Sequence, residues 1–271
     1  MNKTTIVLNS HSLSSFQSCE YKYMFRELVE IVPVNRKRYF EIGTIFSNYF
    51  HLHYYHKMKP TSKWRKLALL SIEKWAERFQ KVPGIDNKEA YTLALVLIAY
   101  RSAYKHEELI PVAVERGFSK ILYEDEANLF IWEGKPDLIA TLNGILICMD
   151  HKTQSRQYNI CELNNQIMGY MWASGAKKFI YNYIKLTKTP EFRRTPVMLD
   201  LQLLEIWKLN TIEWFKRVSV ALQSKTFVPS YQCETKAGVC DYLTICQIPS
   251  DNGKIFTIKS LFKSQKARRS W

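Results

Sequence analysis

The chemistry of this chain centres on charged side chains at the ends of two apolar runs. Asp137 precedes the first run, and Asp150 and Lys152 end the second. The dipeptide Asn143-Gly144 between the runs is a strong signal of a two-residue β-hairpin, so we expect Asp137 to lie beside the second run. Because side chains alternate between the faces of a strand, Asp150 and Lys152 share one face.

Two carboxylates and a lysine can hold a divalent cation and a water next to a phosphodiester. Charges at the end of a buried strand need a partner or a metal, which favours such a site. The alternative is a salt-bridged hairpin at a sheet edge, in which Lys152 pairs with Asp150. Glu115, an acid inside an earlier apolar strand, is either a third carboxylate of the same site or an exposed edge residue.

Composition points to a globular protein with a polyanionic partner. The chain has 271 residues, 46% of them hydrophobic, which fits one large domain or one domain with appendages. Its 39 basic and 25 acidic residues give a net charge of +14, which indicates nucleic acid as the partner. The alternative is a basic surface kept for solubility. With no secretory signal and no apolar run of the roughly 20 residues that span a bilayer, we expect a cytoplasmic protein without a membrane partner.

Hydrophobic periodicity predicts the elements that must position these residues. Helical spacing covers the ranges Ser10–Leu28, Glu41–Met58, Thr61–Lys81, Asn87–Glu108, Ile160–Ser174 and Leu201–Leu222. Strand patterns cover the ranges Val112–Tyr123, Asn128–Trp132, the two runs of the hairpin and Lys178–Leu186. The order of strand, hairpin, helix and strand predicts an α/β core after a largely helical N-terminal third. Ser12 is the expected N-cap of the first helix, which would carry Cys19 in its middle.

Two further groups of polar residues follow the hairpin. Gln166 and Tyr170 lie four residues apart and so share a helix face. Gln166 could orient a phosphate or a water, and Tyr170 could stack or hydrogen-bond on the strand backbone; the alternative is two ordinary residues of an amphipathic helix. The basic loop after the next strand is a candidate phosphate-contact surface and contains Lys185, Lys188, Arg193 and Arg194.

Three of the six cysteines lie close together near the C-terminus. Cys233, Cys240 and Cys246 fall within fourteen residues, which is more typical of metal ligands than of a disulfide framework in a chain without a signal. Their gaps of six and five residues differ from the tight C-x-x-C pair of zinc ribbons. Cys19 by itself would be read as a small buried apolar residue.

Taken together, these motifs resemble the PD-(D/E)xK nuclease superfamily, and specifically its RecB-like exonuclease branch. The matching elements are Gly134-x-x-Asp137, Asp150-His151-Lys152-Thr153 and Gln166-x-x-x-Tyr170. The resemblance implies an α/β fold with a restriction-endonuclease-like mixed sheet flanked by helices. It also implies that Asp137, Asp150 and the His151 backbone carbonyl hold magnesium or manganese. Glu115 falls where the branch often has an acid in its first strand.

The chain departs from the branch at one expected metal ligand. The branch commonly has Gly-x-x-x-His on an early helix, whereas Gly43 is followed at that spacing by Ser47. His51 lies one turn further along roughly the same helix face. Either His51 substitutes as a ligand, or the site has no histidine ligand.

The cysteines extend the resemblance to CRISPR-associated RecB-like and AddB-type nucleases, which carry an iron–sulfur cluster. There one cysteine lies upstream of the core and three downstream, a division that Cys19, Cys233, Cys240 and Cys246 reproduce. The six-residue gap after Cys233 is wider than usual, and four thiolates also suit zinc. Cys148 and Cys161 would be spectators.

The resemblance implies an exonuclease acting on DNA ends or single strands in recombination, repair or end processing. No Gly-x-x-x-x-Gly-Lys-Ser/Thr motif is present, so unwinding would need a helicase or recombination partner. The setting would be the bacterial cytoplasm, or the host-cell cytoplasm for a phage protein. Residues 1–110 would form a helical region, 111–225 the nuclease core, and 226–271 a cysteine-stapled segment with a basic tail, in one integrated unit. The competing hypotheses are a non-catalytic nucleic-acid-binding protein with this fold and a zinc-stapled binding module.

Overall fold

The structure is a computed structural model that describes residues 3–34, 37–60, 69–154, 164–230, 233–235 and 238–264. Its contacts divide the chain into two compact units, each built from separate stretches of sequence. The sheet unit comprises residues 37–120 and 133–207. The cysteine unit comprises residues 1–36, 121–132 and 208–271. The functional division at residues 110 and 225 stays a prediction.

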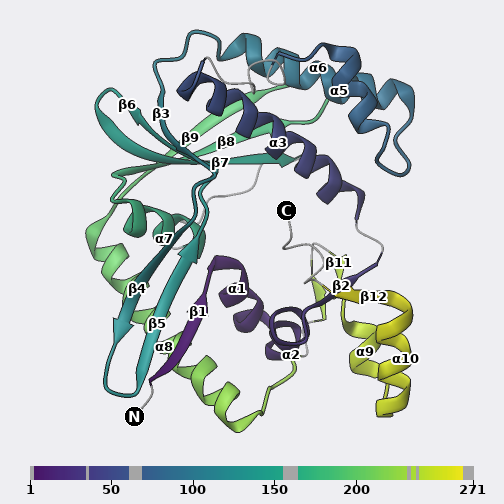
Figure 1. The fold of residues 1–271 in the computed structure, drawn as a ribbon, viewed down its shortest axis with the longest axis vertical. Coiled ribbons are helices and arrows are strands. Elements are labelled where there is room, and N and C mark those ends of the chain that lie inside the picture. The colour runs from purple at the N-terminus through teal and green to yellow at the C-terminus, as the bar shows by residue number, and fades with distance from the viewer. Residues whose placement is uncertain are drawn as a thin grey trace. The chain divides into compact units, whose positions relative to one another are not determined.

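The sheet unit is built on a five-stranded mixed sheet (Figure 1). In spatial order its strands are β3 (Ile110–Val114), β6 (Leu138–Leu142), β7 (Ile145–Gln154), β8 (Lys178–Lys185) and β9 (Phe192–Met198). Only β7 and β8 run parallel, and α7 (Asn165–Ser174) lies between them in the chain. The other neighbours are antiparallel. The long strand β7 therefore occupies the centre of the sheet, which is where a strand is buried on both faces.

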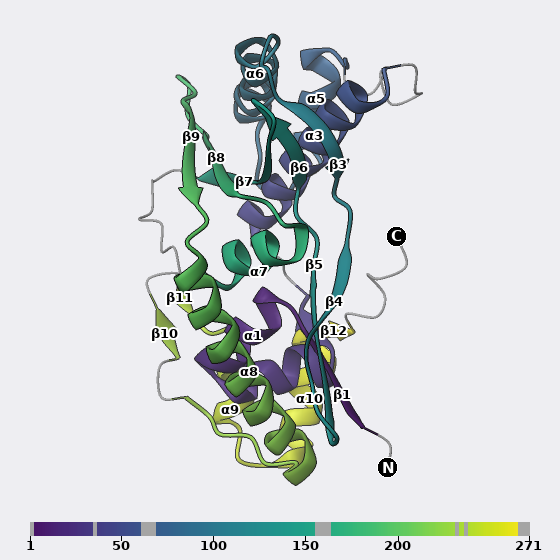
Figure 2. The ribbon, with the colours of Figure 1, turned by 90° about the vertical axis from the view of Figure 1, so that its left-hand side faces the viewer.

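Helices cover both faces of this sheet. One face carries α3 (Arg38–Met58), with α5 (Ile72–Phe79) and α6 (Asn87–Ala103) beside it, and the other carries α7 (Figures 1 and 2). The core between the first group and the sheet is rich in aromatic rings, including the fully buried Phe46, Tyr49, Trp75 and Tyr100. Inward-facing β7 residues such as Ile147 and Met149 complete it. This confirms the expected α/β class with a mixed sheet flanked by helices.

The cysteine unit combines a small sheet with several helices. Its three-stranded sheet has the order β1 (Thr4–Leu8), β5 (Asn128–Gly134) and β4 (Phe118–Glu124), with β1 and β5 parallel. β4 begins and β5 ends in residues of the sheet unit. Its short elements are α1 (Ser10–Ser18), α2 (Glu20–Tyr23), the π-helix η1 (Met24–Leu28), β2 (Ile31–Pro33), β10 (Glu234–Thr235), β11 (Gly238–Val239), α9 (Leu243–Gln247), α10 (Asp251–Leu261) and β12 (Phe262–Ser264). The long helix α8 (Leu201–Ser224) begins in the sheet unit and continues here. Stacked rings of Phe25, Tyr242 and Phe262 join the N-terminal and C-terminal segments.

The first helix is shorter than the sequence predicts. Asn9, not Ser12, is the N-cap: its Oδ1 accepts hydrogen bonds from the backbone N–H groups of His11 and Ser12. The Ser12 hydroxyl in turn accepts from the Asn9 N–H, which completes a capping box. Cys19 has extended backbone angles and separates α1 from α2, so the expectation of one helix through Cys19 was wrong.

The expected strand over residues 112–123 is two strands. β3 ends at Val114 and β4 begins at Phe118, and between them Glu115 has a φ of 45°. An L residue in this left-handed region bends the chain, which explains the interruption. Of the helix expected over residues 61–81, the described part is α5, and the rest falls largely outside the described residues. No helix in the described part of the chain is long and apolar enough to cross a membrane.

Candidate active site

The hairpin of β6 and β7 brings the two acidic residues together. Asn143 and Gly144 have φ angles of 51° and 75°, as a two-residue turn with a left-handed backbone requires. Leu138 pairs with Met149, so Asp137, one residue earlier, comes opposite Asp150. Asp137 Oδ2 accepts a hydrogen bond of 2.8 Å from the His151 N–H. The expected hairpin is therefore confirmed, and it places the Asp137 carboxylate against the end of β7.

Asp150, Lys152 and Gln166 form one hydrogen-bonded group on the α7 face of the sheet. Asp150 is only 3% exposed, and its Oδ1 accepts from Gln166 Nε2 at 2.8 Å. The Lys152 ammonium lies 2.7 Å from Asp150 Oδ2 and donates to Gln166 Oε1 at 3.2 Å. Lys152 and Asp150 therefore form the ion pair that was expected for a salt-bridged hairpin. They lie on the central strand β7, however, and not at a sheet edge. Gln166, from α7, holds both partners.

The negative charges of the Asp137 and Asp150 carboxylates repel each other. Burial, and next the charge of Asp150, raise the pKa of Asp137 to about 7, although the His151 N–H and Lys152 act in the opposite direction. Asp150 Oδ2 is buried and, apart from the Lys152 ion pair, accepts no hydrogen bond in the described structure. Two facing carboxylates, one with an oxygen that accepts no hydrogen bond, are the donor set that a hard divalent cation prefers. The residues present therefore fit such an ion.

Lys152 remains a cation in this environment. Burial alone would lower its pKa, but the Asp150 and Asp137 carboxylates outweigh burial and raise it. A charged ammonium can stabilise negative charge or orient a water, whereas it cannot accept a proton as a base.

Glu115 and His51 lie next to each other, and Glu115 also contacts the segment of Asp137. The Glu115 carboxylate accepts from Ser47 Oγ at 3.2 Å and from Lys135 Nζ at 3.0 Å, and His51 Nδ1 is 3.8 Å from it. The Glu115 backbone N–H donates to the Asp137 carbonyl at 3.0 Å, and the charge of Glu115 helps to raise the pKa of Asp137. No three His, Cys, Asp or Glu side chains in the described ranges form a ready-made metal site.

Tyr170 holds the chain segment that leads to Asp137. Its hydroxyl donates to the Lys135 carbonyl at 3.1 Å, directly after β5, and Gln166 Nε2 reaches the same hydroxyl at 3.5 Å. Its ring meets Phe118 edge to face. A Cβ added to Gly134 would lie 2.7 Å from the Tyr170 ring and 2.6 Å from the Phe118 ring. The Gly134-x-x-Asp137 motif thus has a steric cause: only glycine lets this backbone pass the two rings.

Gly134→Ala should therefore disturb both packing and activity. We expect a loss of unfolding free energy of about 1–3 kcal/mol from overpacking, together with lower activity because Tyr170 must move. Thermal unfolding and the activity of the purified protein measure the two effects. Gly144→Ala, where no atom lies within 4 Å of an added Cβ, is the steric control, although its φ of 75° carries some backbone strain. Equal activity of Gly134→Ala and wild type would contradict the role given to Tyr170.

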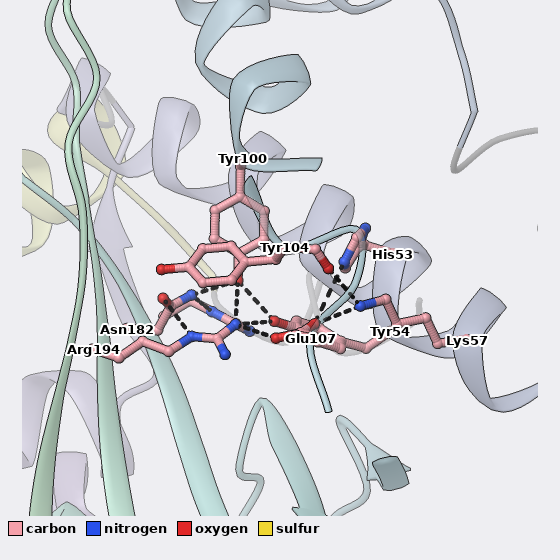
Figure 3. Close-up of polar contacts among 9 residues, drawn as sticks. His53, Tyr54, Lys57, Tyr100, Tyr104, Glu107, Asn182 and Arg194 are labelled. Atoms are coloured by element: carbon pink, nitrogen blue, oxygen red, sulfur yellow. Dashed lines mark hydrogen bonds and ion pairs between the residues drawn. The ribbon is translucent and has the colours of Figure 1, made fainter. Parts of the chain in front are cut away.

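A buried polar cluster supports β7 from the opposite face (Figure 3). The His151 ring stacks on Phe50 at 4.3 Å, and its Nδ1 lies 2.6 Å from Asn182 Nδ2. Asn182 Nδ2 also donates to the Tyr100 hydroxyl at 2.7 Å. Burial, and next the charge of Arg194, hold the pKa of His151 well below its usual range, so the ring is neutral and its Nδ1 accepts from the amide.

The cluster is anchored by a charged pair that the sequence did not reveal. Glu107 Oε2 lies 2.6 Å from Arg194 Nη2, and Lys57 donates to Glu107 Oε1 at 2.5 Å. Arg194 also donates to the Tyr54 hydroxyl at 2.9 Å and lies over the Tyr104 ring at 3.8 Å. The one sequence signal of this cluster is Asn182, a polar residue in the middle of a strand that is otherwise apolar and aromatic.

The expected basic loop is largely part of two strands: Lys185 ends β8, and Arg193 and Arg194 lie in β9. Lys185 pairs with Glu191. Lys188 and Arg193 are exposed, whereas Arg194 contributes to the buried cluster. Of the four expected phosphate contacts, Lys185, Lys188 and Arg193 therefore lie at the surface, and Arg194 lies in the buried cluster.

The four cysteines of the expected cluster lie in the same unit and close to one another. The Cys240 N–H donates to the Cys233 carbonyl at 2.7 Å, and the Ser230 N–H donates to Cys19 Sγ at 3.4 Å. Burial, and next the charges of Cys19, Cys240 and Cys233, raise the pKa of Cys246 to about 11. None of the four forms a disulfide. Cys148 is buried against Ser174 of α7, and Cys161 lies outside the described residues.

Comparison with known proteins identifies the class that this fold and site define. The model of the PD-(D/E)XK nuclease superfamily matches residues 8–247. The chain belongs to this superfamily, and its helix-flanked mixed sheet is consistent with the restriction-endonuclease-like fold. Membership supports a nuclease, that is, a phosphodiesterase.

A solved structure agrees with this assignment at the level of the fold. The Eubacterium rectale protein named "Putative exonuclease" is 13% identical, covers 92% of this chain and 92% of its own, and superposes with a TM-score of 0.52. A second structure, SSO0001, is 14% identical over 77% of this chain and 95% of its own, and its TM-score of 0.36 is too low to support an argument. No curated protein matches the chain.

Proposed function

We propose that this chain is a metal-dependent DNA nuclease, an exonuclease acting on DNA ends or single strands. The observation that carries the proposal is that Asp137, just before β6, lies opposite Asp150 of the central strand β7, and that Gln166 links Asp150 to Lys152. A superfamily match over residues 8–247 and a net charge of +14 agree with it.

The donor set suits magnesium or manganese. Asp137 and Asp150 would hold the ion, with the His151 backbone carbonyl next, and Glu115 and His51 are further candidates. The bound ion supplies a water of lowered pKa and neutralises charge on the phosphate. Glu115 would first have to release Ser47 or Lys135, because both now contact its carboxylate.

The side chains of the protein then have separate tasks. Lys152, a cation beside Asp150, would orient the attacking water or stabilise the charge that develops on the phosphate. Gln166 fixes the positions of the Asp150 carboxylate and the Lys152 ammonium. Tyr170 holds the backbone at Lys135, and so the approach of Asp137 to β7. Together with Gln166 it would also position the substrate strand.

Metal removal gives the direct test of this function. Without a divalent ion the two facing carboxylates have no common partner, so a chelator such as EDTA should abolish degradation of end-labelled single-stranded DNA. Adding back magnesium or manganese in excess should restore it. A protein that never degrades DNA under either ion, yet binds it, would instead be the non-catalytic nucleic-acid-binding protein.

The proposed biological context is the processing of DNA ends. DNA is the expected substrate, with Lys185, Lys188 and Arg193 as candidate phosphate contacts. Arg194 is not a candidate, because its guanidinium pairs with the buried Glu107 carboxylate. Recombination, repair or end processing in a bacterial cytoplasm, or a host-cell cytoplasm for a phage protein, would supply such ends. A helicase or recombination protein would supply unwinding.

The cysteine group supports a second, structural proposal. Cys19, Cys233, Cys240 and Cys246 would ligate an iron–sulfur cluster, with zinc as the alternative. The mutual repulsion of their thiolates, which helps to raise the pKa of Cys246, is what a bound metal would relieve. Brown anaerobically purified protein with stoichiometric iron supports the cluster, stoichiometric zinc supports the alternative, and metal-free folded protein contradicts both.

A further inference from the structure

A row of three side chains crosses the sheet beside the candidate active site. In the register of the sheet, Lys152 of β7 pairs with Tyr183 of β8, and Tyr183 pairs with Arg193 of β9. Residues that pair directly across neighbouring strands point to the same face. Lys152 lies on the α7 face because it contacts Gln166, so Tyr183 and Arg193 lie on that face as well.

The opposite orientation of Arg194 confirms this assignment. Arg194 follows Arg193 in the strand, and its guanidinium contacts Glu107 and Tyr54 on the α3 face. Since neighbouring side chains alternate, Arg193 must point to the other face. Of the two consecutive arginines, only Arg193 therefore lies on the face of Asp150.

Tyr183 is held in place and presents a hydrogen-bond donor. Its ring stacks on Tyr181 at 5.6 Å, and Tyr181 pairs in register with Asp150. Its hydroxyl has no hydrogen-bond partner among the residues that the structure describes. Burial raises the pKa of Tyr183, although the charges of Lys152 and Arg193 act to lower it. The hydroxyl therefore stays protonated at neutral pH, and the two cations lie on either side of it.

Building on the proposed function, we propose that Tyr183 and Arg193 form a subsite for a second phosphate of the DNA strand. The scissile phosphate would lie at Asp150 and Lys152. Strands are about 4.8 Å apart, so the backbones of β7 and β9 are separated by about 10 Å. A row of that length, with a cation at each end and a hydroxyl donor between them, contacts more than one phosphate. Arg193 contributes charge and a planar fork that matches phosphate, and Tyr183 a neutral hydrogen bond.

The subsite makes the enzyme selective for polymeric substrates. A diester with a single phosphate can occupy only the scissile position, whereas an oligonucleotide can use both. Arg193 and Tyr183 would then act on binding of the strand rather than on the chemical step. Their loss should appear mainly in KM, because an interaction made equally in the ground state and the transition state leaves kcat unchanged.

The test compares two substrates in Arg193→Gln and Tyr183→Phe. On a single-stranded oligodeoxynucleotide we expect KM to rise about 10-fold for Arg193→Gln and a few-fold for Tyr183→Phe, with a salt dependence shallower by about one charge for Arg193→Gln. On bis(4-nitrophenyl) phosphate the loss should be several-fold smaller. Lys74→Gln, an exposed cation on α5 paired with Glu77, is the charge control and should match wild type on both substrates.

The outcomes separate this inference from the proposed function. If wild type degrades the oligonucleotide but both variants behave like wild type, or lose equally on both substrates, the subsite is contradicted while the nuclease stands. If wild type degrades neither substrate with magnesium or manganese, the proposed function fails and the subsite fails with it. Thermal unfolding of the variants, expected to be close to wild type for exposed Arg193, shows that the comparison concerns folded protein.

Discussion

Lys152→Ala is expected to lower kcat on a single-stranded DNA oligonucleotide by about 10²–10³-fold, the usual cost of removing one preorganised stabilising donor. The ammonium lies 2.7 Å from Asp150 Oδ2 and contacts Gln166, so its removal takes away the positive charge that lies directly beside Asp150. The measurement is steady-state cleavage of end-labelled DNA with saturating magnesium.

The control for this variant must remove a positive charge elsewhere. Lys74→Ala removes an exposed charge from α5 and should leave kcat within a factor of two of wild type. Lys152→Arg separates charge from geometry: it keeps the charge, but its larger planar group does not match the position that Gln166 and Asp150 fix, so we expect only partial recovery. Full activity of Lys152→Ala would remove the lysine from the chemistry.

Glu107→Gln is expected to cost about 3–5 kcal/mol in the free energy of unfolding, the usual effect of removing one partner from a buried ion pair. Glu107 is 7% exposed, and its carboxylate is shared by Arg194 at 2.6 Å and Lys57 at 2.5 Å. The variant keeps the side-chain shape but leaves two cations without their anion. Urea unfolding followed by circular dichroism measures the change.

An exposed glutamate gives the matched comparison. Glu77→Gln removes the partner of Lys74, a surface ion pair of two helical residues, and should change the unfolding free energy by less than about 1 kcal/mol. A loss of similar size for Glu107→Gln and Glu77→Gln would mean that the cluster behind β7 does not stabilise the fold.

Local rules predicted the part of the site that lies within one hairpin and one helix. Asn143-Gly144 determines the turn, strand alternation determines which face Asp150 and Lys152 share, and helical spacing places Gln166 and Tyr170 together. Each of these depends on residues fewer than twenty positions apart. Strand and helix periodicities alternate through the core, and this alternation correctly predicted the α/β class.

The contacts that the sequence could not show depend on tertiary structure. Glu107 lies just after α6 without any pattern around it, and only the fold brings it to Arg194, 87 positions away. The consecutive Arg193 and Arg194 are equivalent by composition, yet the pleat of β9 sends them to opposite faces. The helix break at Cys19 was missed because the residues on both sides of it are helical, and the extended backbone of this single residue leaves no pattern in the sequence.

Manganese binding tests the central claim most directly. Isothermal titration of the purified protein with Mn²⁺ should reveal a binding site that is lost in both Asp137→Asn and Asp150→Asn, each of which should still unfold cooperatively. Unchanged Mn²⁺ binding in the two variants, or no binding by wild type, would mean that these carboxylates do not share a cation.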